Sequence, residues 1–258
     1  MRGTIVNSYV GFCAPHRRIR PDRVQSDMLQ MHATADTRYS FTAQFLHGAA
    51  IFTGRAHEIE QASTFTDRLI VEHRAYVVGA IVQSAAAIES EIAEVAMHGP
   101  GHHLGSDHTD HAARDFLLPI ADFLSRQKPP LRKYDLVLHF LKKPALDHSS
   151  SMYQSAGLLF QLRNDLMHYK SKWGNQMKHE KKNKNALAKL ENLQFSEPPF
   201  TVPNMNFFPH RCLSASLASW CVTTSETFIN AFYKQLGVTS PLANYTDAFS
   251  VPQPRHKA

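Results

Sequence analysis

Apolar side chains recur along this chain at steps of three and four residues, the spacing that places them on one face of an α-helix. A first run starts at Phe41 and continues through Phe45, Ala49, Phe52, Ala56 and Ile59. A second lies between Thr66-Asp67, which can cap a helix, and the break at Gly99-Pro100. Its apolar stripe is Tyr76, Ala80, Ile81, Ser84, Ile88, Ile92 and Val95. Small residues dominate its middle, so we expect a neighbouring helix to approach closely there.

The same spacing predicts helices in the rest of the chain. The stretch DHAARDFLLPIADFLSRQ is typical of a helix that Pro119 kinks or divides, and RKYDLVLHFLKK of another that stops at Pro144. Serines 149 to 151 provide an N-cap for a helix from about Met152 to Lys172. The expected buried side of that helix comprises Tyr153, Gly157, Leu159, Phe160, Leu166 and Met167.

A last strong helix follows a proline-bearing connector. Pro209 suits its first turn and Gly237 suits its end. Its apolar stripe is Leu213, Leu217, Trp220, Thr224, Phe228, Ala231 and Phe232. Because no segment alternates convincingly between apolar and polar residues, the pattern predicts an all-α bundle of five or six helices. We expect a loosely ordered tail over 1–38, the helical domain over 39–238 and a proline-containing, disordered tail over 239–258.

Composition adds a soluble, basic character to this picture. The 258 residues are 43% apolar, and the formal charge of +6 favours a polyanionic partner if the positive charge is clustered. The most apolar window holds Glu89, Glu91 and Glu94, too many charges for a membrane span. The arginine-rich N-terminus lacks the apolar stretch of a secretory signal. We therefore expect a cytoplasmic protein without membrane contact.

The three cysteines agree with a reducing compartment. They are an odd set, Cys13, Cys212 and Cys221. The last two are nine residues apart in one predicted helix, so their side chains point in opposite directions and cannot pair there.

Histidines gather in the segment HGPGHHLGSDHTDH, residues 98–111. Histidine and aspartate are metal ligands, but no spacing in this segment matches a known zinc pattern, and its glycines indicate a loop. We expect a solvated loop, with a metal site as the alternative.

The most distinctive stretch is LRNDLMHYK, residues 162–170, at the end of an apolar helical run. Asn164 and His168 are four apart and share a helix face, so the asparagine could orient the imidazole. Arg163 is five residues before His168, about 140° round the helix. The two side chains can grip one small group only if the helix end is frayed or a second chain contributes. Glu89 and Glu91 are expected to be exposed, or one of them to face this stretch and tune His168.

Histidine and arginine without a nearby cluster of carboxylates suit the cleavage of RNA by its own 2′-hydroxyl. Histidine can remove the 2′ proton or protonate the leaving 5′ oxygen, and arginine can hold the phosphate as negative charge builds. A symmetric dimer brings two histidines to the two proton transfers. This chemistry requires no metal.

The residues after this stretch are strongly basic. Seven lysines stand against one glutamate in KSKWGNQMKHEKKNKNALAKL. A charge run is commonly a solvated face, but its place makes RNA-backbone binding an equal alternative. The candidate RNA-binding lysines are Lys170, Lys172, Lys178, Lys181 and Lys182. Trp173 could stack on a base or pack in the core, whereas Tyr169 is expected to pack.

Arg163-Asn164-x-x-x-His168 resembles the Rx4-6H signature of the HEPN superfamily (higher eukaryotes and prokaryotes nucleotide-binding). Three segments resemble, in order, helical blocks of uncharacterised bacterial proteins of this type: VEHRAYVVGAIVQSAAAIESEI, SMYQSAGLLFQLRNDLMHYKSKW and FFPHRCLSASLASWCVTTSETF. The resemblance covers roughly residues 66–236 and implies a HEPN-like bundle.

The resemblance implies a homodimeric, metal-independent endoribonuclease without a cofactor, of the kind found as toxins or phage-defence effectors. Arg163 would bind phosphate, Asn164 would be the polar residue beside it, and His168 would be catalytic. One variant of the family has a modified tyrosine two residues after the histidine; here that position is Lys170 and the tyrosine is Tyr169, so this chain departs from that variant. An antitoxin protein is a possible partner. The alternative is a non-catalytic interaction or nucleotide-binding module.

Overall fold

The computed structural model describes residues 40–104, 108–169, 184–202, 204–243 and 249–252. Within these ranges every regular element is a helix, and no strand is formed, so the all-α prediction is confirmed. In chain order the elements are α2 (Thr42–Glu60), α3 (Asp67–His98), η1 (His102–Leu104), α4 (His111–Leu117), η3 (Leu118–Ile120), α5 (Ala121–Ser125), α6 (Leu131–Phe140), α7 (Ser151–Met167), α8 (Lys184–Asn192), η5 (Phe207–Arg211) and α9 (Ala215–Leu236).

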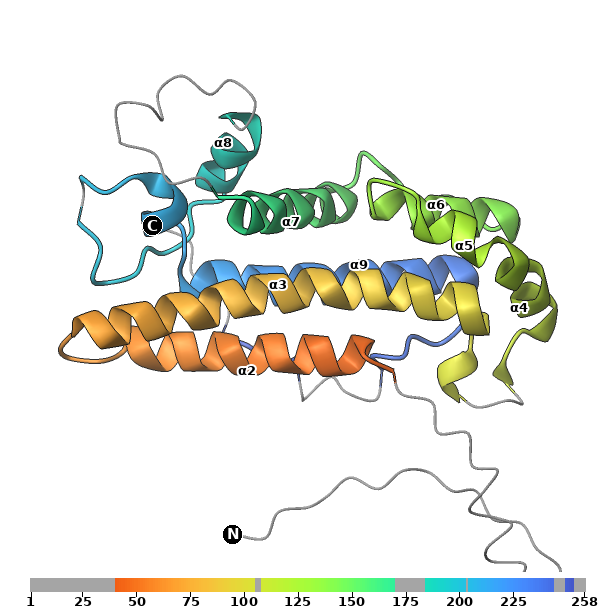
Figure 1. Cartoon of the computed structure of the whole chain (residues 1–258), viewed down its shortest axis with the longest axis horizontal. Helices are drawn as coiled ribbons and strands as arrows, with labels where there is room; N and C mark the ends of the chain where they lie inside the picture. Colours follow the sequence, from red (N-terminus) through yellow and green to blue (C-terminus); the bar gives the residue numbers. More distant parts are fainter. Residues whose placement is uncertain (1–39, 105–107, 170–183, 203, 244–248, 253–258) are drawn as a thin grey trace, which may run out of the picture. The chain divides into compact units, whose positions relative to one another are not determined.

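Helices α2 and α3 form an antiparallel hairpin (Figure 1). Thr66 caps α3, since its hydroxyl accepts a hydrogen bond from the Leu69 N–H at 3.3 Å. Gly99 ends the helix with a φ of 81°, a value that glycine adopts without strain. Phe52 of α2 lies over Gly79 of α3 so closely that a Cβ at Gly79 would be 2.6 Å from the ring. The predicted close approach at the small residues of α3 is therefore confirmed.

Helix α9 packs against α2, α3 and α7, and its inner face is buried along its whole length. It runs parallel to α3: the Ser225 hydroxyl donates to the Ser84 carbonyl at 2.8 Å, and Tyr233 donates to Glu91 further along both helices. The predicted start at Pro209 is wrong, because that residue belongs to the separate turn η5. The helix begins after Ser214, whose hydroxyl accepts from the Leu217 N–H at 3.2 Å.

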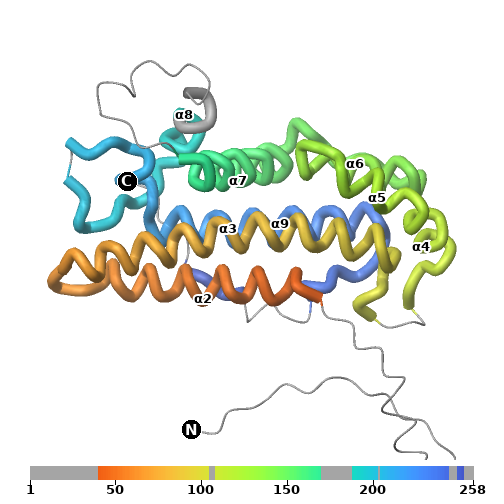
Figure 2. The backbone as a smooth tube through the Cα atoms, in the orientation of Figure 1, coloured from red at the N-terminus to blue at the C-terminus, as the bar shows by residue number. Residues whose placement is uncertain are grey.

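Helix α7 covers α3 and α9 on the side opposite α2, as the backbone trace in Figure 2 shows. Its N-cap is Ser150, which accepts from the Tyr153 N–H at 3.3 Å. The predicted extension to Lys172 is wrong, because the helix ends at Met167 and His168 has non-helical angles of φ −111° and ψ 21°. Met167 was expected on the buried side but is 60% exposed.

Pro119 divides the preceding helical stretch as predicted. Helix α4 ends at Leu117, the short turn η3 contains the proline, and α5 follows from Ala121.

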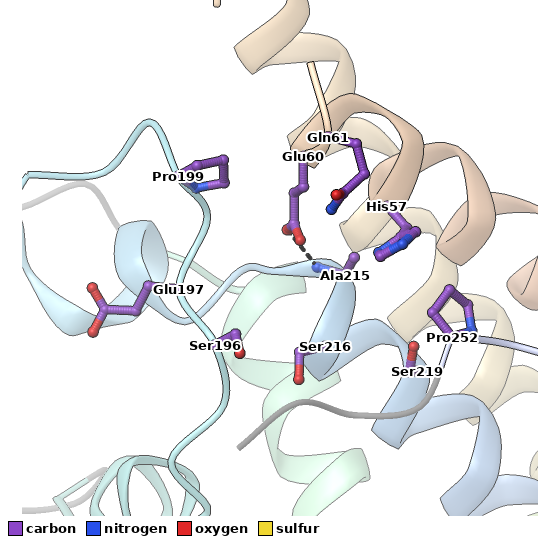
Figure 3. Close-up of a pocket in the computed structure, with 10 residues that line it drawn as sticks. All are labelled: His57, Glu60, Gln61, Ser196, Glu197, Pro199, Ala215, Ser216, Ser219 and Pro252. Carbon is purple, nitrogen blue, oxygen red and sulfur yellow. Dashed lines mark hydrogen bonds between the residues drawn. The ribbon is translucent and has the colours of Figure 1, made fainter. Parts of the chain in front are cut away.

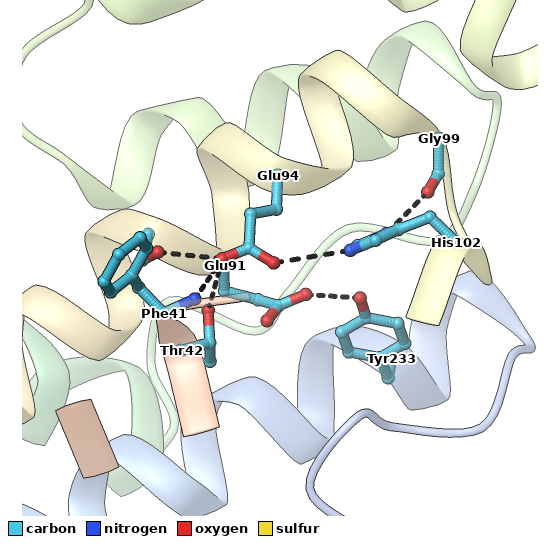
Figure 4. A network of polar contacts seen from close by, with 8 residues as sticks. Phe41, Thr42, Glu91, Glu94, Gly99, His102 and Tyr233 are labelled. Atoms are coloured by element: carbon cyan, nitrogen blue, oxygen red, sulfur yellow. Dashed lines mark hydrogen bonds and ion pairs between the residues drawn. The ribbon is translucent and has the colours of Figure 1, made fainter. Parts of the chain in front are cut away.

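A polar network joins the start of α2 to the ends of α3 and α9 (Figure 4). The Glu94 carboxylate accepts from the Phe41 N–H and the Ser90 hydroxyl, each at 3.0 Å, and pairs with His102 at 3.4 Å. Glu91 accepts a hydrogen bond from Tyr233 and is fully buried. The prediction that Glu91 is exposed is therefore wrong, because that position of α3 faces α9.

The described part of the C-terminal segment is packed against the helices. Leu242 is 1% and Phe249 is 3% exposed, so the prediction of disorder is wrong for these residues. Cys212 and Cys221 are buried free thiols, and Cys212 precedes α9 rather than lying within it. None of the helices in the described ranges has the length and apolar character that a bilayer crossing requires.

Candidate functional site

The three motif residues lie in the last turn and at the C-terminal end of α7. Arg163 is partly buried, whereas Asn164 and His168 are exposed. The His168 N–H donates to the Asn164 carbonyl at 3.0 Å, which closes the helix. Between these two described residues there is no side-chain hydrogen bond, so the Asn164 amide does not orient the imidazole in this structure.

Arg163 faces the neighbouring helix α3. Its Nη2 donates to a Glu89 carboxylate oxygen at 2.8 Å, and the two side chains are 24% and 39% exposed. The guanidinium also lies over the Phe160 ring, 5.6 Å from the ring centroid, at a distance typical of a cation–π contact. Its Nε is buried without a hydrogen-bond partner. The alternative prediction that one of the two glutamates faces this stretch is confirmed for Glu89, although its partner there is Arg163 and not His168.

Arg163 and His168 do not meet within one chain. The arginine is turned toward Glu89, while the imidazole is exposed at the end of the helix. Their spacing predicts this divergence, because five residues correspond to about 140° of helical rotation. A site that uses both side chains on one phosphate needs a second contributor or movement of one of them.

Exposed apolar side chains lie next to the histidine. Met167 is 60% and Tyr169 is 40% exposed. The Tyr169 ring packs edge-on against Phe208 of η5, with 5.9 Å between the ring centroids. One part of the ring therefore packs as predicted, while the rest is exposed. Lys170, Lys172, Lys178, Lys181 and Lys182, together with Trp173, are outside the described residues.

The histidine-rich loop is less solvated than predicted. The His102 side chain is 8% exposed and pairs with Glu94, while His103 packs edge-on against Tyr233 at 5.4 Å. Burial lowers the pKa of His103 to about 4, which favours its neutral form. Within the described ranges, no group of three or more His, Cys, Asp or Glu residues could hold a metal ion.

A cavity of about 200 Å³ lies at the N-terminus of α9, apart from the motif (Figure 3). Glu60 of α2 borders this cavity. Its Oε1 accepts a hydrogen bond from the Ala215 N–H at 2.7 Å and lies 2.9 Å from Nε2 of His73. Glu60 thus ties together the end of α2, the start of α3 and the start of α9. None of the motif residues lines this cavity.

Sequence reasoning missed the contact between Phe160 and Arg163. Phe160 was placed on the buried side of the helix, and it is indeed 5% exposed. The two residues are three apart, a spacing that brings helix neighbours together, so a signal for the contact was present.

Comparison of the chain with models of protein families, with curated proteins and with solved structures found no match. The HEPN resemblance therefore stays a prediction from the quoted residues.

Proposed function

We propose that the protein is a HEPN-like, metal-independent endoribonuclease that acts as a homodimer, in the role of a toxin or a phage-defence effector. The observation that carries the proposal is the exposed imidazole of His168 at the C-terminal end of α7, five residues from the partly exposed guanidinium of Arg163. A histidine at this position can reach a substrate without any rearrangement of the core.

In the proposed reaction the ribose 2′-oxygen attacks the adjoining phosphorus. A histidine takes the 2′ proton, a second proton goes to the leaving 5′ oxygen, and the products carry a 2′,3′-cyclic phosphate and a 5′-hydroxyl. Arg163 stabilises the charge that builds on the phosphate. A guanidinium has five N–H donors, and the hydrogen bond to Glu89 uses one, at Nη2. Glu89 can therefore hold Arg163 in place while other donors bind phosphate.

The homodimer follows from the chemistry. Each chain has one motif histidine for two proton transfers, and Arg163 and His168 diverge within a chain. Met167 and Tyr169 give the end of α7 an exposed apolar surface, which a second copy could cover. Pairing there would place two histidines and two arginines near one strand of RNA.

The test is RNA cleavage by purified protein in EDTA, compared with His168→Ala and Arg163→Ala. Both side chains are at least partly exposed, so we expect folded variants with cleavage lowered by about a hundredfold or more. An all-DNA strand of the same sequence should not be cut. Activity that needs a divalent ion, or that survives both substitutions, would contradict the proposal.

A non-catalytic interaction module is the second candidate, and the ion pair between Arg163 and Glu89 favours it. An arginine already paired with a carboxylate can serve to join α7 to α3. In that case the wild type cuts no RNA, and Arg163→Ala and Glu89→Gln change only stability. Partly exposed ion pairs contribute about 0–1 kcal/mol, so that change would be small.

A further inference from the structure

A groove of about 380 Å³ runs beside α7. The N-terminus of α6, with Pro129, Pro130 and Leu131, forms one wall, and Lys189 of α8 lies on another side. Gly157 of α7 leaves the floor open: a Cβ there would have only Leu131 within 4 Å, at 3.9 Å. Glycine within a helix costs about 0.5–1 kcal/mol relative to alanine. The space over Gly157 thus comes with a helix that is less stable than one with alanine at this position.

The groove and the motif lie on adjoining parts of the same helix face. Gly157 and Gln161, which line the groove, are four residues apart, and Asn164 and His168 continue the row at steps of three and four. Gln161 and His168 are seven residues apart, or about 10 Å along the axis. Phe160 lines the groove and also contacts the Arg163 guanidinium, so one side chain touches both places.

The lining has the chemistry of a site for single-stranded nucleic acid. It combines apolar and aromatic surface with the carboxamides of Gln154 and Gln161 and the ammonium of Lys189. Among the described residues that line the groove, none has an acidic side chain. Aromatic and apolar surface can contact a base, carboxamides can bond its edge, and a lysine can bind phosphate.

We propose that this groove binds a base of single-stranded RNA within a few nucleotides of the bond that is cut. The proposal rests on the proposed function, because it takes His168 and Arg163 as the place of cleavage. It assigns the groove to substrate recognition: the base over Gly157 would set the sequence preference, and Lys189 would bind the adjoining phosphate. The second possible occupant, another copy of this chain, is an outcome of the test.

The test measures binding of a fluorescent oligoribonucleotide with 2′-O-methyl riboses, which cannot be cleaved by this route, in EDTA. Gly157→Leu fills the groove, and Gly54→Leu on α2 is the matched control, since a Cβ at Gly54 has no neighbour within 4 Å. We expect Gly157→Leu to raise the Kd by about tenfold or more and Gly54→Leu to leave it unchanged. Lys189→Gln should weaken binding. It should also make the slope of log Kd against log salt concentration smaller by about one, because one phosphate contact is lost.

Each outcome separates the two proposals. Equal binding by wild type and Gly157→Leu overturns the groove proposal, even if the wild type cuts RNA. If Gly157→Leu weakens binding but the wild type cuts no RNA, the groove binds a base, while the nuclease and the place of the groove beside a cleavage site are both contradicted. A Gly157→Leu protein that is monomeric in sedimentation, while the wild type and Gly54→Leu are dimers, shows that the groove holds a second copy and overturns the groove proposal. Urea unfolding of all variants establishes that each is folded.

Discussion

The carboxyl group of Glu91 is enclosed between α3 and α9 with no exposed surface. One oxygen accepts from Tyr233, and the other, Oε2, has no hydrogen-bond partner. Loss of hydration raises the pKa of Glu91 to about 7, despite the opposing effect of the Tyr233 hydrogen bond. The folded protein therefore binds a proton here that the unfolded chain releases near pH 4.5.

The first prediction concerns Glu91→Gln. The stabilisation from the raised pKa of Glu91 is complete below pH 4.5 and is lost as the pH rises toward 7, a change of about 3 kcal/mol. Glutamine cannot ionise, so the variant should gain up to that amount relative to wild type between pH 5 and pH 8. Urea unfolding at the two pH values measures the difference.

The control for this prediction is Glu58→Gln, on an exposed carboxyl that pairs with Arg55. It removes one exposed carboxylate of α2 and so shows what the loss of a surface charge does to the unfolding curves. If Glu91→Gln behaves in the same way, Glu91 does not carry a proton in the folded protein. The pKa of His102 is raised by its hydrogen bond with Glu94 and by the charge of Glu91, so Glu91→Gln also removes part of that effect.

The second prediction concerns Glu89→Gln. The amide keeps the shape of the side chain but removes the charge that holds Arg163 at 2.8 Å, so cleavage should fall by roughly ten- to a hundredfold. The unfolding free energy should change by less than about 1 kcal/mol, because the pair is partly exposed. Initial cleavage rates and urea unfolding measure the two effects. Asp122→Asn, which disrupts the exposed pair with Arg126, is the control, and an equal loss of rate there would contradict a positioning role for Glu89.

Sequence alone could not distinguish the two glutamates. They are two residues apart on α3, so they point to different sides, but the spacing does not say which side faces which neighbour. The answer depends on Arg163 and Tyr233, which are 74 and 142 residues away. The identities of Arg163, Asn164 and His168 stood out locally, whereas the partners of Arg163 depend on the tertiary fold.

At the level of the elements, two helix glycines have opposite surroundings. At Gly79 a Cβ would be 2.6 Å from the Phe52 ring, and at Gly54 it would meet nothing within 4 Å. The third prediction is that Gly79→Ala destabilises the protein by about 1–3 kcal/mol through overpacking of α2 against α3. Gly54→Ala should stabilise it by about 0.5–1 kcal/mol through helix propensity. Thermal or urea unfolding tests both, and a stabilising Gly79→Ala would contradict the close packing.

Helix boundaries were predictable where one local signal stood alone. Thr66, Gly99 and Pro119 act within their own turn, and the structure follows each of them. The start of α9 was predicted with Pro209 in the first turn, but that proline lies in η5 and the N-cap is Ser214. The end of α7 has no glycine or proline beside it, so its apolar pattern overran the true end at Met167.

For the whole molecule, the fourth prediction concerns the proposed dimer. If each cleavage needs a histidine from both chains, an equal mixture of wild type and His168→Ala should retain about a quarter of wild-type activity after subunit exchange. If each chain acts alone, about half should remain. Cleavage rates of the mixture at constant total protein measure this. A retained half would contradict the shared site while leaving the nuclease itself in place.

For the whole molecule, the sequence predicted the class of the fold but not the surroundings of His168. Apolar periodicity was enough to indicate an all-α bundle, because each amphipathic helix must bury its stripe against another. Whether His168 lies in a groove or on an open surface depends on how α6, α7 and α8 are arranged, and no local spacing encodes that arrangement.

The Glu60 contact with His73 and Ala215 has a consequence for synthesis in the cell. Of the described helices, α9 leaves the ribosome last, yet it covers both helices of the α2–α3 hairpin. Until then the apolar side chains of the hairpin that α9 covers are exposed, and Glu60 keeps its contact with His73 but lacks the Ala215 N–H donor. We therefore expect a chain that ends before Ala215 to lack a stable fold, and with it any activity that the proposed function assigns.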